Sequence, residues 1–282
     1  MMNLEEGRAV CLGTALTYRR RRGAGQAMVL IHGISDDGRN WETFLPVLDP
    51  SWDVVMLDLR GHGQSADPEE GWDFATIAAE VAELCRNLAL ARPWVAGHSL
   101  GGAIALLLAA FHPGIGSAYF LEDPVPLWTA PEGAAMPQAL TRGEIAQGVL
   151  GWLAMCKRMT DAELAAAIRV NVPAWDESEH RAWIDSKLRM SPKVARLASL
   201  GVYAPPGLSV ALARIRAPMF LISAEPARGV LVGDLDIAAL RNLVPHLESL
   251  RLPGVGHNVR RESPAAYREA FLGFFGRVAA GY

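Results

Sequence analysis

Residues 93–112, PWVAGHSLGGAIALLLAAFH, constrain the fold of this chain more than any other stretch. The run Trp94-Val95-Ala96 is typical of a short buried strand, and the Ala-, Leu- and Ile-rich run 103–111 favours a buried helix. Between them lies Gly97-His98-Ser99-Leu100-Gly101, a G-x-S-x-G motif in the strand–turn–helix context that it requires. Such a turn strains its middle residue, and only very small neighbours leave room for it. We therefore predict that Ser99 is a nucleophile raised clear of the sheet edge, beside a helix N-terminus.

Buried apolar runs alternate with helical patterns along most of the chain. A hairpin is expected over residues 8–22, with buried strands at 28–31, 54–57, 94–96, 118–121, 219–223 and 247–252 and helices near 39–48, 74–90, 103–111, 236–244 and 264–278. Residues 125–213 instead show helical patterns broken by prolines, which predicts a helical insertion. The alternation predicts an α/β fold with a mostly parallel sheet and helices on both faces. Ligands of such sheets bind beyond the carboxyl ends of the strands.

A serine hydroxyl needs a base to take its proton. We expect His257 to be that base, because it lies in a glycine-flanked loop after a predicted strand and late in the chain. His98 is next to the nucleophile, so its ring should point away from it. His32 and His62 lie in glycine-flanked turns, where hydrogen bonding of neighbouring loops is the simpler interpretation.

The base in turn needs a carboxylate that fixes its tautomer. Two acids, Glu122 and Asp123, stand at the end of the 118–121 strand, one strand from the nucleophile. We rank Glu122 first and Asp123 second. The loop after the 219–223 strand offers Glu225 and Asp234, which rank behind them.

A tetrahedral intermediate needs N–H donors for its oxyanion. The turn itself should supply the N–H of Leu100. The loop after the 28–31 strand should supply the second donor, with Ile34 preferred and Gly33 as the alternative.

Composition excludes several classes of function. Hydrophobic residues make up 51% and charged residues 20% of the 282 residues, which suits a large core. A net charge of −3 gives no general attraction to nucleic acid or acidic lipid, and the run Arg19 to Arg22 is best interpreted as a solvated strand end or hairpin. The scattered Cys11, Cys85 and Cys156 indicate neither a disulfide framework nor a zinc site. The first ten residues lack a secretory pattern, and no apolar stretch is long enough to span a bilayer, so we expect a cytoplasmic protein.

Four motifs in this order resemble those of the α/β-hydrolase superfamily: His32-Gly33, the segment DLRGHGQS at 58–65, GHSLGG at 97–102, and Gly256-His257. The resemblance implies an eight-stranded, mostly parallel sheet with a helical cap inserted after the sixth strand. The core would comprise residues 1–124 and 214–282, and the cap residues 125–213. The position of the acid after the sixth strand is similar to that in haloalkane dehalogenases and zearalenone-type lactonases. Because Ser99 stands where dehalogenases carry aspartate, the lactonase-like pattern fits better.

The resemblance implies a serine hydrolase that cleaves a carboxylic ester or lactone, with no cofactor and no metal. Trp128 and Trp183 in the expected cap are candidate substrate contacts, which would suit an apolar, aromatic small molecule. Carbon–carbon bond hydrolysis, a cofactor-free lyase and a ligand-binding receptor with vestigial turnover are the alternatives. We expect neither nucleic acid nor a membrane as a partner, and a homodimer stays open.

Overall fold

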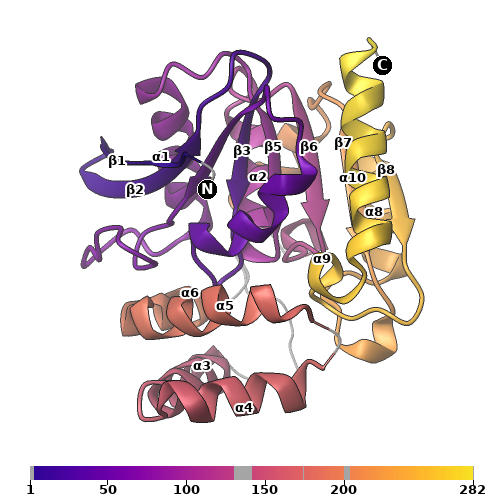
Figure 1. The fold of residues 1–282 in the computed structure, drawn as a ribbon. Helices are drawn as coiled ribbons and strands as arrows, with labels where there is room; N and C mark the ends of the chain where they lie inside the picture. The colour runs from indigo at the N-terminus through magenta and orange to yellow at the C-terminus, as the bar shows by residue number, and fades with distance from the viewer. Residues whose placement is uncertain (1–2, 130–141, 174, 200–203, 282) are drawn as a thin grey trace.

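The computed structural model describes residues 3–129, 142–173, 175–199 and 204–281, and within them an eight-stranded sheet forms the centre of the molecule (Figure 1). The strand order is β1-β2-β4-β3-β5-β6-β7-β8. β1 pairs antiparallel with β2, β2 pairs antiparallel with β4, and the remaining pairs are parallel. The strands are β1 (Glu5–Cys11), β2 (Thr14–Arg21), β3 (Ala27–Ile31), β4 (Asp53–Leu57), β5 (Trp94–His98), β6 (Ala118–Glu122), β7 (Met219–Ser223) and β8 (Glu248–Arg251).

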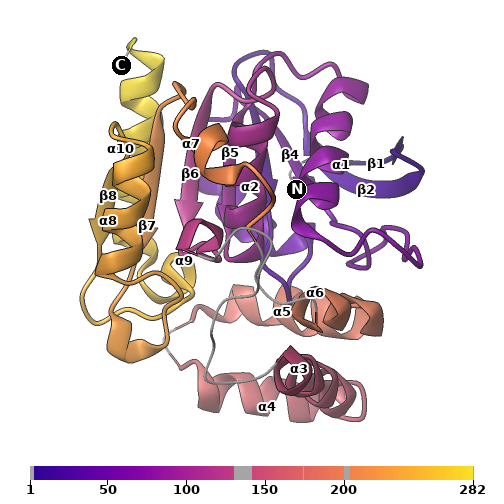
Figure 2. The same ribbon diagram turned by 180° about the vertical axis from the view of Figure 1, so that it is seen from behind.

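Helices cover both faces of this sheet, as the alternating pattern predicts (Figures 1 and 2). One face carries α1 (Phe74–Asn87), α2 (Leu100–Phe111), α7 (Leu208–Leu212) and α8 (Asp234–Leu243), whose apolar residues form a single buried cluster with the strands. The other face carries the 3₁₀ helix η1 (Gly38–Val47) and α10 (Pro264–Ala279). The short helices η2 (Leu127–Thr129), η4 (Pro226–Arg228) and α9 (Val259–Glu262) lie in connections after strands.

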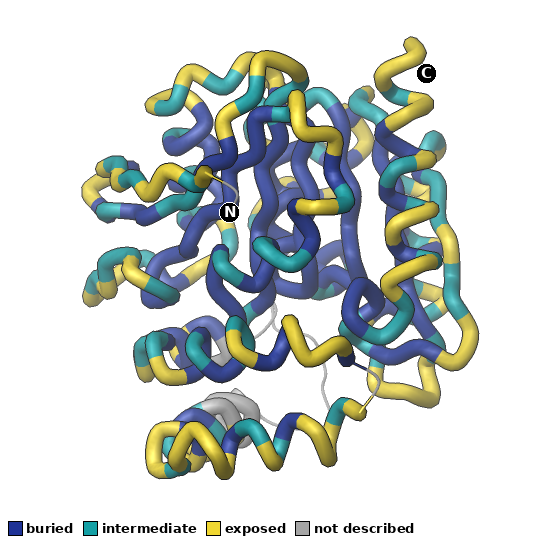
Figure 3. The backbone as a smooth tube through the Cα atoms, viewed as in Figure 1, coloured by how far each residue is buried: buried dark blue, intermediate teal, exposed yellow. Residues whose placement is uncertain are grey.

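The two cores follow from the alternation of side chains along each strand. In β3, Val29 and Ile31 pack on the α2 side, whereas Met28 and Leu30 pack on the α10 side. All four are fully buried, which explains why the run lacks polar residues. Figure 3 shows the central strands as buried and the outer helix surfaces as exposed.

Between β6 and β7 the chain forms helices that lie beyond the carboxyl ends of the parallel strands (Figure 1). They are α3 (Arg142–Cys156), α4 (Asp161–Asn171), α5 (Glu177–Arg189), η3 (Pro192–Val194) and α6 (Ala195–Ser199). The buried cluster around α2 extends into the expected cap range, 125–213. It includes Trp128 of η2 and both Leu208 and Leu212 of α7, together with Leu153 and Leu197 of the cap helices.

Only part of the arginine run at residues 19–22 is solvated as the sequence suggested: Arg22 is exposed, whereas Arg20 and Arg21 are buried. Arg20 is buried and forms a two-bond ion pair with Asp53. Arg21 is also buried, and its guanidinium donates to the carbonyls of Leu45 and Asp49. The two buried arginines of this run therefore attach β2 to its neighbours.

Within the described residues, no helix is both long and apolar enough to cross a membrane. Cys11, Cys85 and Cys156 are free thiols and all three are buried. Across the same residues, no cluster of three or more His, Cys, Asp or Glu side chains could hold a metal ion.

Candidate active site

Ser99 stands at the junction of β5 and α2, as the G-x-S-x-G motif predicts. Its φ of 54° and ψ of −115° lie in a sparsely populated region for a residue with a side chain. The backbone around it is crowded. A Cβ on Gly97 would lie 2.2 Å from Gly101 O, and a Cβ on Gly101 would lie 2.2 Å from Ile31 O. Glycine at both positions is therefore required by contact.

His257 follows β8 and is paired with a carboxylate. Its Nδ1 lies 2.5 Å from Asp123 Oδ2, and because an ionised carboxylate only accepts, Nδ1 carries the proton and Nε2 is left as the basic nitrogen. The imidazole is half-buried, whereas Asp123 is fully buried. The His257 ring also lies beside the His98 ring, with 4.7 Å between centroids.

Asp123 also accepts hydrogen bonds from the loop after β7. Its Oδ2 accepts from Leu231 N at 2.9 Å and its Oδ1 accepts from Val232 N at 3.0 Å. This loop was the alternative source of the acid, and it instead supplies two N–H donors to the acid of β6. Of its own acids, Asp234 pairs with Arg251 and Glu225 accepts from Gly254 N.

The first-ranked acid, Glu122, was the wrong choice. Its Oε1 accepts from Arg260 N at 2.9 Å and lies 3.6 Å from His98 Nδ1, and the His257 contact belongs to Asp123. The reason is the strand geometry. Glu122 lies on the same face of β6 as Phe120, and Phe120 packs on the α10 side. Asp123 lies past the end of the strand and has a φ of 36°. Burial raises the pKa of the Glu122 carboxyl to about 7, and the Arg260 charge opposes this rise.

The loop after β3 lies directly against Ser99. A Cβ on Gly33 would be 3.5 Å from Ser99 Cβ and 2.8 Å from His98 Cδ2. The carbonyls of residues 33–35 each have a partner: Gly33 O accepts from Asp36 N, Ile34 O lies 2.7 Å from His62 Nε2, and Ser35 O accepts from Lys187 Nζ at 2.5 Å. These bonds direct the intervening peptide groups. For the N–H groups of Ile34 and Leu100, the described part of the chain offers no acceptor, which suits donors reserved for an oxyanion.

His32 and His62 act as loop supports, as expected. His32 Nε2 accepts from Leu59 N at 3.0 Å, and His32 Nδ1 lies 2.8 Å from Gly33 O. Both rings are fully buried, and burial lowers the pKa of each imidazole. His98 is buried as well, and desolvation together with the neighbouring His257 holds its pKa well below the usual value.

The two tryptophans proposed as substrate contacts are engaged in packing. Trp128 is buried, and its Nε1 donates to Asp236 O in α8 at 2.7 Å. Trp183 packs edge-on against Trp152 and Trp175 inside the cap helices, and Lys187 Nζ lies 4.4 Å from its ring centroid. Their role in substrate binding stays a prediction.

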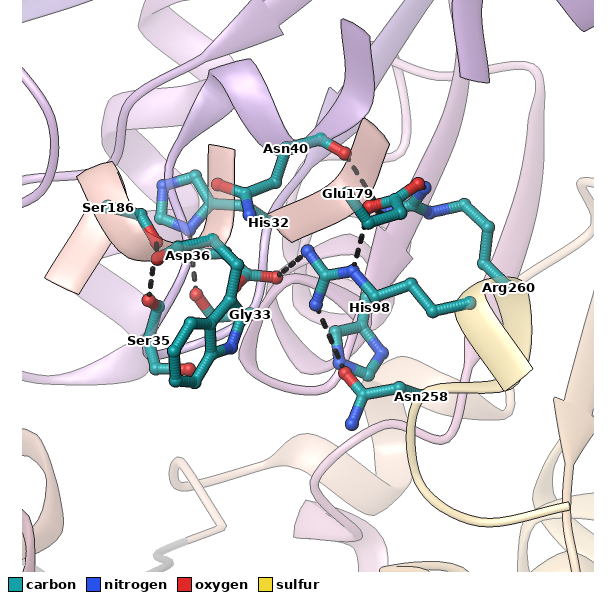
Figure 4. A network of polar contacts seen from close by, with 12 residues as sticks. His32, Gly33, Ser35, Asp36, Asn40, His98, Glu179, Ser186, Asn258 and Arg260 are labelled. Atoms are coloured by element: carbon teal, nitrogen blue, oxygen red, sulfur yellow. Dashed lines mark hydrogen bonds and ion pairs between the residues drawn. The ribbon is translucent and has the colours of Figure 1, made fainter. Parts of the chain in front are cut away.

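A buried network of charges was missed at the level of sequence (Figure 4). It joins α5 of the cap to the loop after β3 and to α9, through Glu179, Lys187, Asp36, Arg260 and Arg261. The signal in the sequence was slight: two adjacent arginines follow His257 by three and four residues.

Comparison with known proteins agrees with this fold. A family model described as alpha/beta hydrolase fold matches residues 26–154, which run from the β3 strand through the candidate nucleophile to the cap. A crystal structure titled E-2-(acetamidomethylene)succinate hydrolase superposes with a TM-score of 0.78, at 21% identity, over 97% of this chain and 100% of that one. The chain has the α/β-hydrolase fold, and its residues 26–154 match the model of that family.

Two further matches are informative. A 2-(acetamidomethylene)succinate hydrolase of Mesorhizobium japonicum is 27% identical over 271 residues, which cover 95% of this chain and 94% of that protein. A structure of an N-formylmaleamic acid deformylase from Pseudomonas putida has a TM-score of 0.76 at 20% identity, over 95% of this chain and 100% of that one. The Mesorhizobium protein, which matches over nearly its full length, is thus not a zearalenone-type lactonase.

Proposed function

We propose that this α/β-fold hydrolase cleaves a carboxylic ester or lactone through an acyl intermediate on Ser99, with His257 as base and Asp123 as the orienting acid. The observation that carries the proposal is the 2.5 Å contact between His257 Nδ1 and Asp123 Oδ2, which leaves Nε2 available as a base at the sheet edge that holds Ser99. The acid of the proposal is the second-ranked one from the sequence.

In the first half of the reaction, His257 Nε2 takes the Ser99 proton while Oγ bonds to the substrate carbonyl carbon. The N–H groups of Ile34 and Leu100 hold the resulting oxyanion. When the intermediate collapses, the carbonyl re-forms, the bond to the alkoxide breaks, and the His257 proton passes to the leaving oxygen.

In the second half, water attacks the acyl-serine and His257 takes its proton. Collapse releases the carboxylic acid, and the proton returns to Ser99 Oγ. The Asp123 carboxylate stabilises the imidazolium in both halves, and its own position depends on the N–H groups of Leu231 and Val232.

A fluorophosphonate probe tests the nucleophile without knowledge of the substrate. We expect covalent labelling of Ser99, loss of labelling in Ser99→Ala and His257→Ala, and parallel loss of p-nitrophenyl butyrate hydrolysis. An unlabelled wild-type protein, under conditions that label a control esterase, would contradict the proposal.

Amide cleavage is a second candidate, favoured by the names of two relatives, an acetamidomethylene-succinate hydrolase and a deformylase. The same residues would serve, with His257 protonating a leaving nitrogen instead of an oxygen. An ester and an N-acyl amide that share the same acyl group separate the two, since an ester hydrolase prefers the first by a wide margin. An aromatic lactone in the same panel tests the apolar substrate expected from the sequence.

A further inference from the structure

Arg261 joins three parts of the molecule that meet at the candidate site. Its Nη2 donates to Asp36 Oδ2 at 2.9 Å, its Nη1 donates to Asn258 Oδ1 at 3.2 Å, and its Nε donates to Glu179 Oε2 at 3.0 Å. Figure 4 shows Asp36, Asn258 and Glu179 converging from separate segments of the chain. A guanidinium is planar and has donors in fixed directions, so three such bonds fix both its position and its orientation.

The first arm reaches the loop that carries the candidate oxyanion donors. Asp36 lies two residues after Ile34, and its other oxygen accepts from Lys187 Nζ at 3.1 Å. The same ammonium donates to Ser35 O, so Ser35 and Asp36 are each hydrogen-bonded to a charged side chain. A shift of Asp36 would carry the Ile34 peptide group with it.

The second arm reaches the loop of the candidate base. Asn258 directly follows His257, and Glu262 accepts from the N–H groups on both sides of the histidine, Gly256 N at 2.8 Å and Asn258 N at 3.3 Å. Arg261 therefore holds the side chain of Asn258 while its neighbour Glu262 holds the peptide groups of the same loop.

The third arm reaches the cap helices. Glu179 of α5 accepts from Arg261 and also from Arg260 Nη1, at 2.6 Å. The ring of Trp175 stacks on the Arg261 guanidinium, with 4.6 Å between Cζ and the ring centroid. The cap is thus linked to both loops through a single side chain.

Such a network is a poor means of gaining stability. Arg261, Asp36 and Glu179 are all buried, with exposed fractions of 4%, 4% and 7%. The desolvation of buried ion pairs offsets most of their attraction, and apolar residues of similar volume often serve stability as well. Fixed bond directions are what apolar residues cannot supply.

We propose that Arg261 is a positioning residue, which sets the distance between the oxyanion loop at 33–36 and the His257 loop and ties that distance to the seating of α5. The inference rests on the proposed function, because it assigns these two loops to one reaction. Loss of Arg261 leaves substrate contacts in place and misaligns the groups that act in the transition state. Misplacement of about 1 Å costs roughly 100-fold in rate.

The test compares Arg261→Gln with Arg20→Gln in p-nitrophenyl butyrate hydrolysis and in the rate of fluorophosphonate labelling. Arg20 is the matched control, since it is a buried arginine with a two-bond carboxylate partner, Asp53, on β2, a strand that pairs with neither β5 nor β6. We expect Arg261→Gln to lower kcat and the labelling rate by about 10- to 100-fold with little change in KM. Arg20→Gln should leave kcat unchanged for its folded fraction.

Glu179→Gln is the second variant, because it is isosteric, removes the charge on the cap side, and leaves the arginine in place. We expect a smaller loss of kcat in the same direction. If Arg261→Gln folds and keeps the wild-type kcat, the inference is overturned. If Arg261→Gln does not fold, a wild-type kcat in Glu179→Gln overturns it. So does an equal loss in Arg20→Gln. If wild-type protein is unlabelled and Ser99→Ala retains full activity, the proposed function itself has failed, which is a different result from an active wild type with an unaffected Arg261→Gln.

Discussion

Ser99 and Asp123, which directly follow the adjacent strands β5 and β6, both have positive φ values, 54° and 36°. Each conformation costs on the order of 1–3 kcal/mol for a residue with a side chain. The surrounding contacts hold them there. Ser99 N donates to Glu122 O at 2.8 Å, and Asp123 N donates to Ile222 O at 2.9 Å. In this conformation Asp123 reaches Nδ1 of His257.

The two neighbouring acids should differ sharply in their effect on catalysis. Asp123→Asn keeps the shape of the side chain and removes the charge that fixes the His257 tautomer, so we expect kcat to fall by about 10⁴. Glu122→Gln can still accept from Arg260 N and should lower kcat far less. Steady-state hydrolysis of p-nitrophenyl butyrate measures both. A larger loss of kcat in Glu122→Gln than in Asp123→Asn would indicate that Glu122, not Asp123, is the acid that orients His257.

Glu122 should also make stability depend on pH. Burial raises the pKa of its carboxyl from 4.5 to about 7, so the folded state binds more protons than the unfolded state between these values. The stability that the neutral form contributes is complete below pH 4.5 and is lost as the pH rises through 7. Glu122→Gln lacks this titration. In urea unfolding, the free energy of unfolding of the variant relative to that of wild type should be higher at pH 8 than at pH 5, by at least about 1 kcal/mol. An unchanged difference between the two proteins would contradict this.

At the scale of elements, the turn from β5 to α2 depends on a backbone approach that only glycine allows, since a Cβ on Gly97 would lie 2.2 Å from Gly101 O. Strand, motif and helix are all local in sequence, and the prediction of this unit from residues 93–112 was therefore accurate. The expected helix at 39–48 appears as the 3₁₀ helix η1, and the last strand is shorter than expected, at 248–251. End positions depend on tertiary contacts, which local patterns do not encode.

Gly101→Ala tests that approach. The added Cβ would lie 2.2 Å from Ile31 O, so the strand and the helix must separate, and we expect destabilisation on the order of 3–5 kcal/mol. Gly151→Ala in α3 is the control, because nothing lies within 4 Å of its Cβ and alanine favours a helix by up to about 1 kcal/mol. Thermal unfolding of both variants gives the comparison. Equal melting temperatures would show that the core can absorb the methyl group.

At the scale of the whole molecule, α5 is attached to the core and α4 is attached to α5. Besides Glu179, α5 places Lys187 on Asp36 and Arg189 on Asp37, at 3.1 and 2.6 Å. By contrast, α4 buries only Leu164 and Ile168 among its described side chains, and Leu164 packs with other cap residues. The cap helices are therefore fastened unequally.

Hydrogen exchange should reveal this difference. We expect the amides of residues 177–189 to exchange more slowly than those of residues 161–171, because opening α5 must break buried ion pairs while opening α4 need not. Mass spectrometry of peptides from the two helices measures the rates. Identical rates would indicate that both helices leave the core together.

Local sequence patterns account for what could be predicted. The alternation of buried apolar runs with helical patterns predicted the sheet and its two helical layers, and the G-x-S-x-G motif predicted the tight turn at Ser99. The choice between Glu122 and Asp123 was a different problem, since both are acids at the same strand end. It was decided by the face of β6 on which each side chain lies and by two N–H groups more than 100 residues away. The same holds for the charge network, in which Arg261 and Asp36 are 225 residues apart and Lys187 and Asp36 are 151 apart. No local pattern records such pairs, because only the packing of the cap against the strand ends brings them into contact.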